Sequence, residues 1–378
     1  MSEIQHTQRP FTPDWISPPG ATIADFLEEL DWTQEELAER LEFSTKHVSQ
    51  LINGKASITS DTAIKLSQVL GSSIQFWLNR EANYQANLAR LKYEQKLQEW
   101  MPWLDELPIK ELQKMGELSS CRITQESKPR LVKEALEFFG CASPEAWKKC
   151  YQSHHLSVNF RQSLSNQSQK KLGAVSTWLR LGEIASQDEM LHSFDRKKFE
   201  AAIRECRNLT QASEAKIQTL VKQYCREAGV IFVFIPALAG ARVSGVARWL
   251  NTHRPLIQVS LYGKTNDKFW FTFFHEAAHI LLHGKDKIFV DDCHDNSELE
   301  SKSEEEQEAD QWAKNILIPE RYVDRLKTLK SRVSVNSFAD EIGLHPGIIV
   351  GRLQHERILP MNQLNNLKVS YTFQSDFP

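Results

Sequence analysis

The sequence lacks the features that would direct it to a membrane or, through its overall charge, to nucleic acid. Its 378 residues carry 46 Lys and Arg against 49 Asp and Glu, so the formal net charge of -3 gives no general attraction to a polyanion. The first residues, MSEIQHTQRPFTPDW, contain no apolar core of the signal-peptide type. The longest apolar run, residues 230–241, is too short to span a bilayer and contains Pro236. We therefore expect a soluble cytoplasmic protein with no membrane partner.

Paired cysteines and internal repeats are also absent. No two cysteines have the CxxC spacing of a zinc ribbon, and their scattered positions indicate no disulfide framework. Reduced, structural thiols are the simpler interpretation. No repeat of the solenoid type is present. The six cysteines are Cys121, Cys141, Cys150, Cys206, Cys225 and Cys293.

The pattern along the chain predicts a mainly α protein with a small β-sheet. The β-branched runs GVIFVFIP (229–236) and LIQVSL (256–261) are the two predicted strands. Five segments follow from the changes of pattern: a Pro-rich lead-in (1–20), short helices with tight turns (21–94), a charged helical middle region (95–228), strands followed by long helices (229–330), and short helices broken by Gly and Pro (331–378). The middle region is either a spacer of packed helices or a sensor, in which Trp100 and Trp103 would line a pocket.

Two short helices joined by a tight turn are predicted between residues 33 and 54. Thr33 can cap the amide of Glu36, whose side chain can reach back, so that TQEE forms a capping box. Ser44 can cap a second helix, which ends at Asn53 and Gly54, where glycine suits a left-handed conformation. The pair forms a helix-turn-helix, a motif in which the second helix enters the major groove of DNA.

The polar residues in and just after the second helix are the candidate DNA contacts: Thr45, Lys46, Ser49, Gln50 and Lys55. Lys46 suits guanine and Gln50 suits adenine, while Lys55 can hold a phosphate. Eight acidic residues lie between positions 25 and 42, whereas residues 43–60 contain the two lysines and no acid. This polarised charge favours operator DNA as a partner. The alternative is a solvated face of a small helical bundle.

This region resembles the HigA-type antitoxin branch of the lambda-repressor-like (XRE family) helix-turn-helix proteins. The resemblance rests on Pro19-Gly20, TQEELAERL, STKHVSQLINGK, DTAIKLSQVLGSS and the FWL of residues 76–78. It implies a five-helix domain over residues 21–94 that binds palindromic operators as a homodimer. Those antitoxins are short chains, whereas this sequence continues to residue 378.

The stretch FTFFHEAAHILLHG, residues 271–284, places three histidines and a glutamate in an apolar helix. At about 100° per residue, His275 and His279 share one face a turn apart, where two imidazoles can take adjacent corners of a zinc tetrahedron. Glu276 lies beside that face and can take a proton from zinc-bound water and pass it to a leaving amine. Structural histidines are the alternative, but without partners they would be costly in an apolar core.

A third metal ligand is available in the helical stretch SEEEQEADQWAKNILIP, residues 303–319. Glu306 falls on the face that Ala309 and Ala313 mark as buried, so it is the predicted ligand. Asp310, one turn further, can accept the remaining N–H of a ligand histidine. For both acids the alternative is a solvated helix start, which the helix dipole also favours.

Four other polar residues are candidates for further roles at this motif. We expect His283 to end the helix before Gly284, with a role behind the metal ligands as the alternative. Arg242, Tyr322 and His294 are the candidate donors to an oxyanion.

Residues 229–319 resemble the ImmA/IrrE family of zinc metallopeptidases. The shared features are a GV strand, a strand just before the helix, F-T-x-x-H-E-x-x-H-x-L-L-H-G, and E-x-E-A-D-x-W-A-x-x-x-L-x-P. The resemblance implies an α+β, zincin-like domain over residues 229–330, followed by a small helical extension over 331–378 that packs on it. It also implies Zn²⁺ as cofactor, with His275, His279 and Glu306 as ligands and Glu276 as general base. Members of the family commonly cleave helix-turn-helix repressors.

The two resemblances predict a DNA-binding transcriptional regulator that carries a zinc endopeptidase and acts on a repressor-type protein or on itself. The protein partner would be a repressor or a toxin. The alternative is a non-catalytic, antitoxin-like repressor whose metal domain binds a partner or senses a signal. Glu276 favours the enzyme, because a site kept only for scaffolding has no use for a general base.

Overall fold

The computed structural model describes residues 17–152, 166–187, 193–285, 289–292 and 303–376. The chain divides into two compact units, residues 1–99 and 100–378, which are considered separately below. Among the described residues, no helix is long and apolar enough to cross a membrane.

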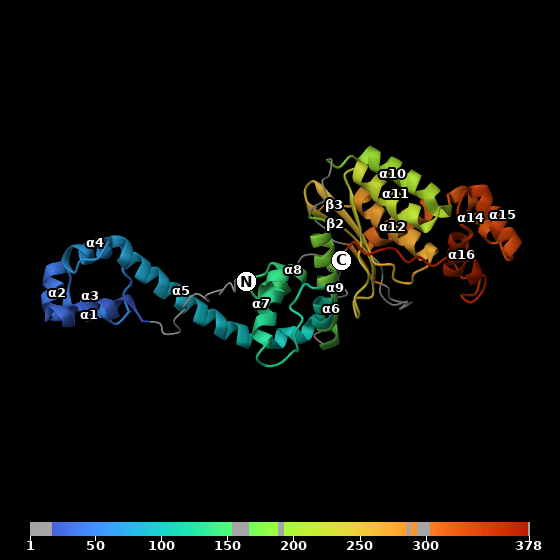
Figure 1. The fold of residues 1–378 in the computed structure, drawn as a ribbon. Coiled ribbons are helices and arrows are strands. Elements are labelled where there is room, and N and C mark those ends of the chain that lie inside the picture. The colour runs from blue at the N-terminus through green and yellow to red at the C-terminus, as the bar shows by residue number, and fades with distance from the viewer. Residues whose placement is uncertain (1–16, 153–165, 188–192, 286–288, 293–302, 377–378) are drawn as a thin grey trace, which may run out of the picture. The chain divides into compact units, whose positions relative to one another are not determined.

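The first unit has the five helices that the sequence predicts, packed on one apolar core (Figure 1). They are α1 (Pro19–Leu30), α2 (Gln34–Leu41), α3 (Thr45–Ile52), α4 (Ser60–Val69) and α5 (Ile74–Glu99). Ile23, Leu37, Val48 and Trp77 are buried together at its centre. At Gly20, α1 approaches the last turn of α3 so closely that a Cβ atom would lie 2.2 Å from the Leu51 and Ile52 carbonyl oxygens.

The capping residues of α2 and α3 agree with their sequence signals in all but one respect. The Thr33 and Ser44 hydroxyls accept hydrogen bonds from the amides of Glu36 and His47. Gly54 has a positive φ of 65°, as expected after α3. The predicted return contact of the capping box is wrong, because the Glu36 carboxylate accepts a hydrogen bond from Arg40 instead, an i,i+4 pair along the helix.

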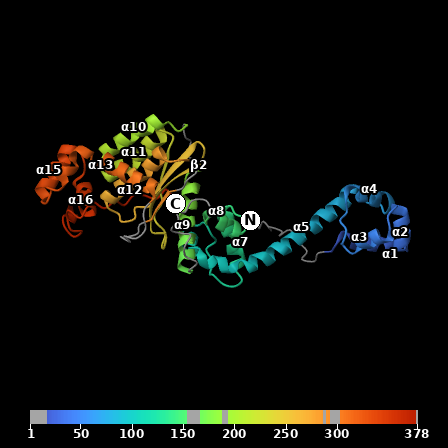
Figure 2. The same ribbon diagram turned by 180° about the vertical axis from the view of Figure 1, so that it is seen from behind.

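The predicted boundary at residue 94 lies inside α5, which is 26 residues long and runs to Glu99 (Figure 2). Its first turns belong to the core through Trp77, whereas residues 82–96 are exposed or half-buried. The first unit therefore ends where this helix ends.

The second unit begins with short helices around an aromatic cluster. Trp103 is buried, and its ring centroid lies 5.5 Å from that of Trp147 and 6.1 Å from that of Phe139. These rings fill the interior of the helical cluster. Trp103 is therefore a core residue, and the prediction that it lines a pocket is wrong. The elements up to residue 227 are η1 (Met101–Glu106), α6 (Ile109–Lys114), α7 (Lys128–Phe139), α8 (Pro144–Gln152), α9 (Asn166–Ala185), α10 (Arg196–Asn208), η3 (Leu209–Gln211) and α11 (Glu214–Glu227).

A four-stranded sheet follows, with strand order β1-β3-β2-β4. The strands are β1 (Ile231–Phe234), β2 (Val243–Asn251), β3 (Arg254–Val259) and β4 (Phe289–Asp292). β1 pairs with β3 in parallel, and β2 pairs antiparallel with both β3 and β4. The sequence predicted β1 and β3 correctly and missed β2 and β4, although β2 is the longest strand.

One face of the sheet packs against helices from both sides of the expected boundary at residue 228. Phe199 of α10 and Val221 of α11 are buried in the same core as Phe232 of β1 and Phe273 of α12 (Asn266–Leu282). Figure 1 shows α10, α11 and α12 together on this side of the sheet. The apolar cover of the sheet therefore comes from both sides of the predicted boundary.

The opposite face of the sheet is covered by α9 through polar contacts. The buried Arg248 of β2 forms an ion pair with Glu183 at 2.8 Å and donates to the Leu179 carbonyl oxygen. Trp178 donates to the Ile235 carbonyl oxygen, and Gln258 of β3 donates to that of Trp178. The helical middle region thus contributes to both faces of the sheet.

The C-terminal segment packs on α12, as the sequence predicts, but it is not helical throughout. Its elements are α13 (Glu304–Leu317), η4 (Glu320–Tyr322), α14 (Val323–Leu326), α15 (Arg332–Ile342), α16 (Pro346–His355) and η5 (Asn365–Leu367). The residues after η5 are extended, and Tyr371 and Phe373 pack edge-to-face against Phe269 of α12.

Candidate metal centre

Helix α12 runs through the interior of the second unit. Its side chains are nearly all buried, including His275 and His279, each 2% exposed, and Glu276, which is fully buried. Aromatic residues surround these three: Phe273 and Phe274 follow one another on the helix and are both completely buried. A buried imidazole or carboxylate needs a partner, so the contacts of these side chains decide what the helix does.

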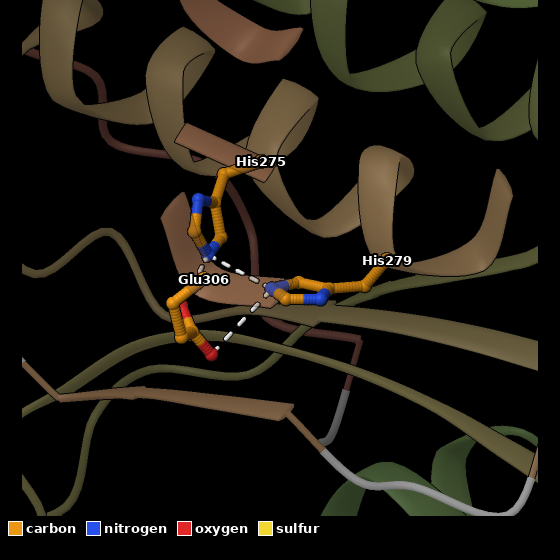
Figure 3. A group of neighbouring side chains, drawn as sticks. All are labelled: His275, His279 and Glu306. Atoms are coloured by element: carbon orange, nitrogen blue, oxygen red, sulfur yellow. Dashed lines mark hydrogen bonds and ion pairs between the residues drawn. The ribbon is translucent and has the colours of Figure 1, made fainter. Parts of the chain in front are cut away.

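The ring nitrogens of the two histidines meet the Glu306 carboxylate of α13 (Figure 3). His275 Nε2 lies 3.1 Å from Glu306 Oε2, and His279 Nε2 lies 3.6 Å from Glu306 Oε1. The two Nε2 atoms lie 3.0 Å apart. One ligand atom from each residue falls within 4.8 Å of the others, a spacing at which the three could hold one metal ion. The structure thus brings together the three predicted ligands.

The electrostatics of the cluster favour the protonation states that a cation requires. Burial lowers the pKa of His279, which keeps its imidazole neutral. Burial would raise the pKa of Glu306, but the neighbouring His275 and His279 outweigh it and hold that pKa well below its usual range. Two imidazoles and one carboxylate are the donor set of some catalytic zinc sites that keep a fourth position open.

Asp310 lies where the sequence places it. Its Oδ1 is 3.0 Å from His275 Nδ1, on the side of the ring away from Glu306. The carboxylate therefore faces the far nitrogen of His275, while Nε2 is directed at Glu306.

His283 ends the helix, as expected, and its side chain also contacts one of the predicted ligands. Its backbone is extended (φ -109°, ψ 164°), so it caps α12 after Leu282. Its ring nevertheless turns back, and its Nδ1 lies 2.8 Å from His279 Nδ1. His283 Nε2 lies 3.2 Å from Oε2 of Glu308 on α13. The contact joins two helices, so the pattern along one helix does not reveal it.

Gly245 of β2 is a site residue that the sequence did not reveal. A Cβ atom there would lie 2.6 Å from Glu276 Oε1 and 2.7 Å from Thr272 Cγ2. The missing side chain makes room for the Glu276 carboxylate against the strand. The available signal was a glycine inside the apolar run VSGV, which often marks a close approach to a strand.

Several contacts hold α13 beside α12. The Ser303 hydroxyl accepts from the Glu306 amide and caps the first turn, and the small, buried Ala309 and Ala313 permit close packing. At the other end, Arg207 of α10 donates to the carbonyl oxygens of Ile316 and Leu317. The register of Glu306 and Asp310 against the histidines is thereby fixed at both ends of the helix.

The three candidate oxyanion donors remain predictions. Arg242 is exposed and has a positive φ of 46°. Tyr322 is half-buried and packs on Phe338. His294 lies outside the described residues.

In the first unit, the predicted DNA contacts lie on and just after α3. Thr45, Lys46 and Lys55 are exposed, while Ser49 and Gln50 are half-buried. Asn53 Nδ2 donates to the Ser49 carbonyl oxygen at 2.7 Å and lies 3.4 Å from Ser49 Oγ.

Comparison with known families supports this division into two units. Residues 23–77 match the helix-turn-helix family, and residues 227–353 match the IrrE N-terminal-like domain of peptidase family M78. The chain thus carries a helix-turn-helix domain at its N-terminus and an IrrE N-terminal-like domain in its C-terminal part. The second match begins at residue 227, the last residue of α11, close to the change of pattern that the sequence shows at residue 229.

Individual relatives match over short stretches. The uncharacterized HTH-type transcriptional regulator YddM of Escherichia coli K12 is 46% identical over 61 residues, which are 16% of this chain and 65% of that protein. The antitoxin HigA-1 of Vibrio cholerae is 44% identical over 55 residues, 15% of this chain and 51% of the antitoxin. A solved structure of a HigA-family antidote protein of an addiction module from Coxiella burnetii is 34% identical, covers 22% of this chain and 92% of that one, and has a TM-score of 0.21. The chain thus spans less than two thirds of the length of these first two relatives.

Proposed function

We propose that this chain, which joins a helix-turn-helix domain to an IrrE N-terminal-like domain, is a DNA-binding transcriptional regulator whose second unit is a zinc endopeptidase. The observation that carries the proposal is the convergence of His275, His279 and Glu306 beside a completely buried Glu276. A buried general base next to an open metal position has a use in hydrolysis and none in scaffolding.

The donor set fits zinc, and His275, His279 and Glu306 would hold it. Bound there, zinc would polarise the scissile carbonyl and acidify the attacking water. Glu276 takes the proton from that water while the water oxygen bonds to the carbonyl carbon. The carbon–nitrogen bond then breaks, and Glu276 returns the proton to the leaving amine. Gly245 leaves space for the Glu276 carboxylate, and Asp310 directs the His275 ring.

The first unit would bring the protein to an operator. Lys46 and Gln50 would contact base edges in the major groove, with Thr45, Ser49 and Lys55 on neighbouring groups. Support comes from the match to the helix-turn-helix family and from the exposure of Lys46 and Lys55. A homodimer on a palindromic site is the arrangement that the resemblance to HigA-type antitoxins implies.

The peptidase substrate is proposed to be a repressor-type protein or a second copy of the chain itself. A DNA-bound peptidase would be held where such proteins act. The second candidate function is a non-catalytic antitoxin-like repressor, and the similarity to the antitoxin HigA-1 favours it, because an antitoxin has a toxin as its protein partner.

A substrate trap decides between these functions. Glu276→Gln removes the base and leaves the metal ligands in place, so a trapped substrate should stay bound and intact. Both versions are purified from native cells, with Glu304→Gln on the exposed start of α13 as a matched charge control. Bound proteins are identified by mass spectrometry and bound DNA by sequencing.

A repressor-like protein that is retained by Glu276→Gln and cut by the wild type and the Glu304→Gln control would establish the regulatory peptidase. The same intact partner and the same operator on all three would instead support the non-catalytic repressor.

A further inference from the structure

The nitrogen farther from the metal position is engaged in both ligand histidines, but by different means. His275 Nδ1 meets the Asp310 carboxylate directly, at 3.0 Å. His279 Nδ1 meets His283 Nδ1 at 2.8 Å, and His283 Nε2 meets Glu308 Oε2 at 3.2 Å. His279 is therefore connected to a carboxylate through a second imidazole.

The direction of these hydrogen bonds follows from the groups involved. A carboxylate only accepts, so His283 must donate from Nε2 to Glu308. In a neutral imidazole the other nitrogen is then an acceptor, so His283 Nδ1 accepts from His279 Nδ1. His279 consequently carries its proton on Nδ1, and its Nε2 presents a lone pair toward Glu306 and His275.

Helix α13 supplies both carboxylates, Asp310 and Glu308, which lie on either side of the face that packs on α12. Ala309 is completely buried at that contact. At about 100° per residue, Asp310 lies to one side of Ala309 and Glu308 to the other. Asp310 reaches the first ligand histidine, and Glu308 reaches His283 beyond the second. One helix thus reaches His275 directly and His279 through His283.

We propose that His283 and Glu308 are positioning residues that fix the tautomer and ring orientation of His279 for the metal. The role of the metal itself rests on the proposed function, whereas the tautomer is a property of the chain alone. We call the chain of contacts from His279 through His283 to Glu308 the relay. The Glu308 side chain is 62% exposed, so solvent competes for its contact with His283 and makes that contact weaker than the one between Asp310 and His275. We expect its loss to reduce zinc affinity about tenfold, the lower end of the range for partners behind a ligand.

The test uses the full-length protein with zinc removed and then added back. Glu308→Ala and His283→Leu break the relay. His283→Gln can still accept from His279 and donate to Glu308, so it should rescue. Glu304→Ala removes an exposed acid from the same helix and serves as the matched control. Zinc affinity is measured by competition with a chromophoric chelator. The tautomer of His279 is measured in the zinc-free protein from imidazole ¹⁵N chemical shifts, and thermal unfolding confirms that each variant is folded.

The relay predicts an Nδ1–H tautomer for His279 in the wild type, in Glu304→Ala and in His283→Gln. It predicts a mixed tautomer and about tenfold weaker zinc binding in Glu308→Ala and His283→Leu. Unchanged tautomer and affinity in the two breaking variants would overturn it. If the wild type bound no zinc, the proposed peptidase would fail, and the tautomer in Glu308→Ala against wild type would still decide whether the relay exists.

Discussion

Helix α3, the candidate recognition helix, and helix α12, which carries the candidate metal ligands, differ in where their polar residues lie. α3 has eight residues, its buried Val48 and Leu51 anchor it, and Thr45 and Lys46 are exposed. α12 has 17 residues, and His275, Glu276 and His279 are buried inside the unit. Contacts made from an exposed surface act nearly independently, whereas those in a packed interior depend on each neighbour. Substitutions should therefore have graded effects at α3 and abrupt effects at α12.

The largest effect is expected from loss of a metal ligand. Glu306→Gln or His279→Ala should weaken zinc binding by more than about 1,000-fold, because removing only a partner behind a ligand already costs about 10–100-fold. Operator binding should persist, since the two units have separate cores. Metal content by mass spectrometry and a DNA mobility-shift assay check both parts. Joint loss of zinc and DNA binding would show that the units are not separable.

A substitution outside the motif should be nearly as damaging. In Gly245→Ala the new Cβ displaces the Glu276 carboxylate, and a displacement of about 1 Å can cost about 100-fold in rate. Zinc affinity should stay within about threefold, because the Cβ would meet Glu276 and Thr272 and none of the ligands. The rate of substrate cleavage and the zinc affinity are measured together. Gly284→Ala, which has open space around it, is the control; full activity of Gly245→Ala would remove this glycine from the site.

A more moderate effect is expected at the recognition helix. Lys46→Ala combined with Gln50→Ala should weaken specific operator binding by about 2 kcal/mol, or about thirtyfold, taking about 1 kcal/mol for each lost base contact. Thermal stability and zinc content should not change, since neither side chain belongs to a core. Titrations with operator and with random DNA at one fixed salt concentration measure the ratio. An unchanged ratio would show that the assignment of the recognition helix is wrong.

The smallest effect concerns pH and the packing of the C-terminal helices on α12. His345 Nδ1 accepts from both Asn266 Nδ2 and the Gly347 amide, so it must be unprotonated there. Burial lowers the pKa of His345 below its ordinary value of about 6.5. As pH falls through about 6.5 the unfolded chain binds the proton first, so this contribution is present above that pH and is lost below it.

The loss should be about 1 kcal/mol or less, the usual net value of a hydrogen bond. His345→Asn keeps a capping acceptor without the titration. Unfolding by denaturant at pH 7.5 and pH 5.5 should show a smaller pH dependence in this variant than in the wild type. Equal pH dependence in the two would contradict the prediction.

Sequence signals predicted the ends of α2 and α3 well, because these ends depend on hydrogen bonds between residues close together in the chain. The caps at Thr33 and Ser44 and the left-handed Gly54 follow from hydrogen bonds that close within a few residues. β2 was missed because its buried Arg248 reads as a surface residue and because its partner β4 lies far along the chain, although β3 follows β2 directly through a tight turn. Arg248 is tolerated inside because Glu183 of α9 neutralises it.

The candidate site shows the same division. The spacing of His275 and His279 was readable because 3.6 residues per turn is a property of any α-helix. The choice of Glu306 also agreed with the structure, because Ala309 and Ala313 marked the face that packs on α12. The glycine inside VSGV indicates a close approach, but the sequence does not say that Glu276 is what approaches, since only the folded sheet brings the two together.

The sequence by itself determined which residues are able to act: the two histidines one turn apart, the neighbouring glutamate, and a short polar helix behind a turn. These follow from local geometry, which is the same in every helix. Only the tertiary structure decided that β2 backs Glu276, that α10 and α11 complete the core, and that His283 turns back from the end of α12 toward Glu308. Such contacts join segments distant in the sequence, and their free energy appears only when the interior closes and each buried polar group must find a partner.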